Sequence, residues 1–68
     1  MSLEFGDKLK IIRTERHMSQ EDMAKLLNTS KQVISRYETK QRTPKIAVVT
    51  TYAEKLGVPL EYLIDNSL

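Results

Sequence analysis

Four polar side chains in the middle of the chain have the types and the spacing of a hydrogen-bonding surface. If residues 31–39 are helical, at about 100° per residue, these four share one side, and three apolar or aromatic residues share the other. The polar set is Lys31, Gln32, Ser35 and Arg36, and the other set is Val33, Ile34 and Tyr37. The second set predicts a packed side. The first predicts a side free to contact a partner, as in helices that bind DNA.

The residue types needed for bond-making chemistry are sparse. His17 is the only histidine and cysteine is absent, so neither a metal site nor a catalytic triad is predicted. Ser30 and Ser35 lie near no plausible general base. Glu21 and Asp22 fall in the first turn of a predicted helix, where acids stabilise the helix dipole. We therefore expect no enzyme activity, no cofactor and no metal, and no small-molecule ligand is indicated.

Two capping serines place the polar surface within a pair of short helices. Ser19 and Ser30 each precede a helical pattern and can accept a hydrogen bond from a first-turn amide. Asp22 stands where a longer Glu or Gln would complete a capping box with Ser19. We expect helices over about 20–27 and 31–39, joined by a tight turn, with Ala24 small enough to let the second helix cross the first closely.

Three further helices are predicted around this pair. Phe5, Leu9 and Ile12 recur at helical spacing, so the first helix covers about 5–16. A threonine cap with proline at the first helical position, Thr43-Pro44, and the stop at Gly57 bound a fourth helix. Its β-branched run, residues 48–51, suits a strand better, but no second strand exists to pair with it. A short helix over 59–64 follows. The expected fold class is all-α, with five helices in one domain, 1–68, and a core within about 5–64.

The same spacing predicts which side chains are buried. The expected core comprises Phe5, Leu9, Ile12, Met18, Met23, Ala24, Leu26, Leu27, Val33, Ile34, Tyr37, Ile46, Val49, Ala53, Leu56, Leu60 and Leu63. Tyr37 has an alternative role as a platform on which single-stranded bases stack, but its inward phase favours the core.

Charge is distributed unevenly along the chain. The net charge is only +2, but residues 25–45 hold six bases and one acid, whereas the flanking segments are slightly acidic. The predicted polar helix therefore lies in the basic third, which is the pattern of a phosphate-facing surface or of an ordinary solvated basic face. The longest apolar run, residues 46–49, is too short to span a membrane. With no cysteine and no signal-peptide pattern, a cytoplasmic protein is expected.

These features together resemble the lambda-repressor-like helix-turn-helix family, which includes phage repressors, Cro proteins and Xre-type regulators. The resemblance covers about residues 5–64. It depends on the capped pair that begins at Ser19-Gln20, on Ala24, Ile34 and Tyr37, and on the segment Arg42-Thr43-Pro44. It implies a sequence-specific double-stranded DNA-binding protein that acts as a transcriptional regulator, with its third helix in the major groove.

The resemblance also assigns roles to individual residues. The implied base contacts are Lys31, Gln32, Ser35 and Arg36, whose groups can pair with guanine and adenine edges. The implied phosphate contacts are Gln20, Ser30, Lys40, Arg42 and Thr43, which would position the protein without specifying sequence. Family members commonly join the first and third helices by a partly buried pair, here Arg13 and Glu38. The alternative is that Arg13 contacts solvent or phosphate.

At three turn positions where the family often has glycine, this chain has His17, Asn28 and Lys40. We expect positive φ at each, and lysine tolerates this left-handed backbone conformation less well than histidine or asparagine does, so Lys40 is the least favourable of the three.

The C-terminal end suggests a partner surface. Tyr62, Ile64 and Leu68 can form an apolar patch, and a domain that contacts few base pairs usually binds DNA as two copies. We expect a homodimer, at least on DNA; the alternative is a monomer with a frayed terminus. Two other functions remain open: an antitoxin that binds a toxin partner and regulates its own operon, and a helix-turn-helix fold that has lost DNA binding.

Overall fold

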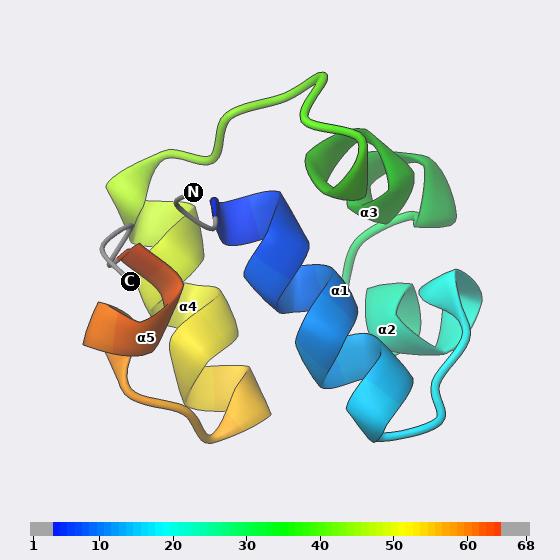
Figure 1. Ribbon diagram of the computed structural model, residues 1–68, viewed down its shortest axis with the longest axis horizontal. Coiled ribbons are helices and arrows are strands. Elements are labelled where there is room, and N and C mark those ends of the chain that lie inside the picture. Colours follow the sequence, from blue (N-terminus) through cyan, green and yellow to red (C-terminus); the bar gives the residue numbers. More distant parts are fainter. Residues whose placement is uncertain (1–3, 65–68) are drawn as a thin grey trace.

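A computed structural model describes residues 4–64, which form five α-helices and no strand (Figure 1). They are α1 (Phe5–Glu15), α2 (Gln20–Leu26), α3 (Lys31–Glu38), α4 (Ile46–Leu56) and α5 (Leu60–Ile64). In Figure 1, α1 runs through the middle, with α2 and α3 on one side and α4 and α5 on the other. The predicted all-α, five-helix fold is confirmed.

The predicted capping serines begin the two central helices. Ser19 Oγ accepts from the Asp22 backbone N–H at 3.0 Å, and the Ser19 N–H donates to Asp22 Oδ2 at 3.1 Å. The shorter aspartate therefore completes a capping box. Ser30 Oγ accepts from the Val33 N–H at 3.2 Å at the start of α3. The register of α3, and so the direction of each of its side chains, is set locally by this cap.

The helix ends also follow the predicted turn chemistry. His17, Asn28 and Lys40 have φ of 57°, 59° and 64°, and Gly57 has 70°. Each is followed by a residue whose N–H returns to a carbonyl five positions earlier, as in Met18 N to Arg13 O at 2.9 Å. This is the Schellman arrangement, which satisfies carbonyls that a helix end would otherwise leave unpaired. The expectation of positive φ at the three non-glycine positions is confirmed.

The prediction for the start of α4 is wrong. Thr43 and Pro44 remain in the loop, and the helix begins at Ile46 after Lys45, which provides no side-chain cap. The β-branched run is nevertheless helical. The Thr50 and Thr51 hydroxyls donate to helix carbonyls four residues earlier, at 2.9 and 3.0 Å. These hydrogen bonds let threonine fit a helix.

One hydrophobic core joins the helices. It includes most of the predicted positions and is formed by Phe5, Leu9, Ile12, Met23, Ala24, Leu27, Ile34, Tyr37, Val49, Tyr52, Ala53, Leu56 and Leu63. Leu26 and Ile46 were predicted to be buried but are 40% and 63% exposed. Each is a terminal residue of its helix, Leu26 the last of α2 and Ile46 the first of α4, so its own helix flanks it on one side only. Met18, Val33 and Leu60 pack against the core from partly exposed positions.

Two packing features were not predicted. Tyr52 is buried beside Phe5 and Tyr37, and the Phe5 and Tyr37 rings meet edge to face at 5.2 Å. Gly6 lies where α1 touches the end of α3, and a Cβ there would lie 1.8 Å from the Tyr37 carbonyl oxygen. The glycine therefore permits a backbone approach that no side chain would allow.

Candidate nucleic-acid interface

The outward side of α3 forms one wall of a shallow groove. Six polar residues line it: Gln20, Lys31, Gln32, Ser35, Arg36 and Gln41. Ser35 is half-buried, while Lys31, Gln32 and Arg36 are exposed. Ile34 and Tyr37 lie on the buried side of the same helix, so Tyr37 is a core residue and not a stacking platform. The structure thus brings all four predicted base-contacting residues to one surface.

The chemistry of the groove suits an anionic, hydrogen-bonding partner. Its six lining residues include two cations and no acid. Amide and hydroxyl groups between the cations add both donors and acceptors. Gln41, which follows the positive-φ turn at Lys40, was not among the predicted contacts. The positive φ at Lys40 could be predicted from the sequence, and the Gln41 N–H that follows it returns to the Arg36 carbonyl at 2.8 Å.

Beneath the groove, Arg13 and Glu38 join α1 to α3. Arg13 Nε donates to Glu38 Oε2 at 2.8 Å, and Nη2 donates to Oε1 at 3.1 Å. The Arg13 and Glu38 side chains are only 14% and 4% exposed. The hydrogen bonds that Arg13 donates to Glu38 raise the pKa of the guanidinium above its usual value. Arg13 also donates to the Met18 carbonyl at 2.9 Å, so it is directed into the protein.

Gln20 belongs to this network, which the sequence did not indicate. Its Nε2 donates to Glu38 Oε1 at 3.2 Å. The side chain predicted to contact a phosphate is thus held by a nearly buried carboxylate at one edge of the groove.

The other phosphate candidates have different surroundings. Arg42 is exposed and its guanidinium lies 5.8 Å from the centre of the Tyr37 ring. Ser30 and Thr43 are exposed. Lys40 pairs with Asp7 at 3.1 Å and with Glu4 at 3.7 Å, and the Asp7 carboxylate raises the pKa of Lys40. Lys40 therefore offers less uncompensated charge to a phosphate than Arg42 does.

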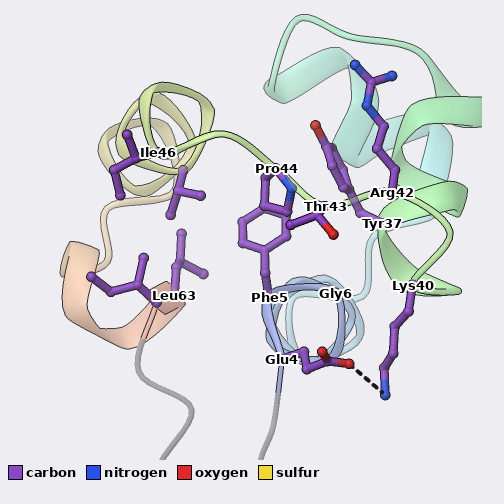
Figure 2. Close-up of a pocket in the computed structure, with 12 residues that line it drawn as sticks. Glu4, Phe5, Gly6, Tyr37, Lys40, Arg42, Thr43, Pro44, Ile46 and Leu63 are labelled. Atoms are coloured by element: carbon purple, nitrogen blue, oxygen red, sulfur yellow. Dashed lines mark ion pairs between the residues drawn. The ribbon is translucent and has the colours of Figure 1, made fainter.

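A second hollow lies between the two halves of the fold. Its volume is about 330 Å³, and Figure 2 shows Phe5 in it, with Ile46 and Leu63 on one side and Tyr37 and Arg42 on the other. The Glu4–Lys40 pair borders it. Its charged lining residues are Lys40 and Arg42 against one acid, Glu4, and the rest of its wall is largely apolar. Its excess of cations is therefore smaller than in the α3 groove, which has two cations and no acid.

The C-terminal patch is partly present. Tyr62 and Ile64 are 39% and 46% exposed, and Lys8 Nζ lies 5.2 Å from the centre of the Tyr62 ring. Leu68 lies outside the described residues.

Within residues 4–64 no three His, Cys, Asp or Glu side chains are grouped as a metal site. None of the five helices there has the length and apolar character needed to cross a membrane.

A capped helix pair, with a polar second helix supported by three others, defines a helix-turn-helix domain. Comparison with known families agrees: a family model described as Helix-turn-helix matches residues 9–63, and the chain belongs to this family. The lambda-repressor-like assignment is confirmed. This is a class of transcription regulators and not of enzymes.

Two curated relatives resemble nearly the whole chain. The cryptic phage CTXphi transcriptional repressor RstR of Vibrio cholerae is 32% identical over 63 residues, which are 93% of this chain and 57% of RstR. The SPbeta prophage-derived uncharacterized HTH-type transcriptional regulator YonR of Bacillus subtilis (strain 168) is 33% identical over 93% of this chain and 58% of YonR. The chain thus spans a little over half the length of these relatives.

Two solved structures share the fold. The P22 c2 repressor, solved in complex with a synthetic operator, superposes with a TM-score of 0.82 at 18% identity and covers 96% of this chain and 98% of its own. The hypothetical transcription factor NHTF from Neisseria gives 0.80 at 22% identity and covers 88% and 69%, respectively. At these identities the likeness establishes the fold alone.

Proposed function

We propose that this chain is a sequence-specific double-stranded DNA-binding domain of a transcriptional regulator, with α3 in the major groove. One domain, residues 1–68 with its core in about 5–64, would carry this function in the cytoplasm. The proposal depends on one observation. Six polar side chains and no acid line the groove, and the opposite side of α3, which forms its wall, is buried. Membership of the helix-turn-helix family and the operator-bound P22 c2 fold support it.

The proposed contacts divide by chemistry. Lys31 and Arg36 can donate to the O6 and N7 acceptors of guanine, Gln32 can pair with adenine, and Ser35 can pair with either. Gln20, Ser30, Lys40, Arg42 and Thr43 would hold the phosphates on either side. Base contacts distinguish one sequence from another, whereas phosphate contacts contribute to binding of every duplex. Together they would place the protein over promoter DNA.

Selection of bound duplexes from a random pool tests the proposal directly. We expect a short preferred site and binding that weakens steeply with salt, because cations that neutralise phosphates release condensed counterions. Arg36→Ala or Gln32→Ala should relax the preference at particular positions, with a loss of about 1–3 kcal/mol of discrimination each. Arg42→Ala should weaken binding to all duplexes equally.

The matched control is Lys55→Ala. Lys55 is exposed in the last turn of α4 and does not line the groove, so this variant removes the same unit of charge elsewhere. Affinity that falls equally in Lys55→Ala and Arg36→Ala would mean that only net charge matters, and would refute recognition by α3.

We further propose that two copies bind together, through α5 and the residues after it. The exposed Tyr62 and Ile64 support this, and Leu68 stays in the prediction. Two half-sites about one helical turn apart would then be contacted by two identical groove surfaces. Sedimentation of the free protein and of its DNA complex tests it; a one-to-one complex at all concentrations would contradict it.

The antitoxin alternative gains no support, since the two curated relatives are named as regulators.

A further inference from the structure

The Gln20 amide has only one orientation that its surroundings permit. A carboxylate accepts hydrogen bonds and cannot donate them, so the group that faces Glu38 Oε1 at 3.2 Å must be the Gln20 NH₂. One amide hydrogen is used in that bond. The second hydrogen and the carbonyl oxygen are left for the groove that Gln20 lines. Without the carboxylate, the amide could rotate and present either end.

Glu38 is itself held in place. Two nitrogens of Arg13 bond its two oxygens in parallel, and a third Arg13 nitrogen bonds the Met18 carbonyl. The planar guanidinium therefore fixes the plane of the carboxylate as well as its position. It also balances the negative charge of Glu38, which would otherwise lie directly behind the surface proposed to meet phosphates.

We propose that Glu38 is a positioning residue for DNA recognition: held by Arg13, it orients the Gln20 amide so that a donor N–H faces the DNA backbone. Arg13, in α1, would thus influence the orientation of the Gln20 amide in the groove without contacting DNA itself. The inference rests on the proposed DNA-binding function and adds to it the group that prepares the Gln20 contact.

The variants must separate orientation from stability. Removing one partner would strand a buried charge, whereas replacing both by apolar residues of similar size is often tolerated. The test variant is therefore Arg13→Met with Glu38→Leu, compared with Gln20→Ala and with the triple variant. Circular dichroism establishes that each is folded, and affinity for the selected duplex is measured at fixed salt.

We expect the double variant and Gln20→Ala to weaken binding by a similar factor, about three- to tenfold, the usual worth of one hydrogen bond. The triple variant should bind no more weakly than either. Wild-type affinity in the double variant would overturn the proposal, as would losses that multiply in the triple variant. A wild-type chain that binds no duplex would instead refute the proposed function, and this inference with it.

A second measurement needs no destabilised variant. In the ¹H–¹⁵N spectrum of the free wild-type protein, the two Gln20 side-chain amide protons should differ widely in shift and one should exchange slowly. Gln41 is the control, because it lines the same groove and is exposed. Gln20 amide protons that resemble those of Gln41 would show that Glu38 does not hold the side chain.

Discussion

Replacing Glu38 by alanine should strongly destabilise the fold. The carboxylate is 4% exposed and accepts two hydrogen bonds from Arg13, at 2.8 and 3.1 Å, and one from Gln20. In the variant, Arg13 would keep only its bond to the Met18 carbonyl and would be left as a largely buried charge without a partner. Breaking buried pairs in this way typically costs 3–5 kcal/mol.

The lower end of that range applies here, because Arg13 is 14% exposed and water can reach part of the guanidinium. A loss of about 3 kcal/mol lowers the melting temperature of a domain of this size by about 12–24 °C. The assay is thermal unfolding followed by circular dichroism at neutral pH. Glu54→Ala is the control: it removes an exposed glutamate of α4 and should change stability by no more than about 0.5 kcal/mol.

The decisive comparison is between the two variants. A Glu38→Ala melt that matches wild type would refute the view that the buried pair contributes to stability. If Glu54→Ala lowered the melting temperature as much as Glu38→Ala does, the loss of a negative charge, and not the loss of this pair, would be responsible. Arg13→Met with Glu38→Leu should melt closer to wild type than Glu38→Ala does, because no charge is stranded.

Three further predictions concern the fold. Gly6→Ala should lower the melting temperature although alanine favours helix, because its Cβ would meet a backbone oxygen of α3 at 1.8 Å; an unchanged melt would contradict the close approach. Ile34→Ala, at a fully buried site, should cost about 2–5 kcal/mol in urea unfolding, whereas Ile46→Ala, at a 63% exposed site, should cost far less. The Ser19 backbone N–H in the capping box lowers the pKa of Asp22 below the ordinary 3.8. The stability that the ionised Asp22 carboxylate contributes is therefore complete above that pH and is lost as the pH falls below it. Asp22→Asn should therefore flatten the acid side of the stability curve, and equal steepness in both proteins would refute this.

Features that depend on a few neighbouring residues were predictable from the sequence. The caps at Ser19 and Ser30 and the positive φ at His17, Asn28 and Lys40 are decided within one or two turns of the chain. Helical periodicity then identified most of the core and the outward side of α3. These local features determine where each central helix begins and which way it faces.

Features that depend on packing between distant segments were not predictable in this way. Ile46 fits the helical repeat of α4, but its exposure is decided by which elements happen to cover the first turn. Tyr52 completes an aromatic cluster whose other members come from α1 and α3. The bond between Gln20 and Glu38 joins residues 18 positions apart and exists only once α2 and α3 are docked.

The central claim is that the outward side of α3 determines which DNA sequence is bound. The most direct test is to select duplexes from one random pool with wild-type protein and with Gln32→Ala in parallel. We predict that wild type enriches a defined site and that the variant loses the preference at one base pair of each half-site while the rest of the site is retained. Identical enriched sites and equal affinities for both proteins would contradict the account.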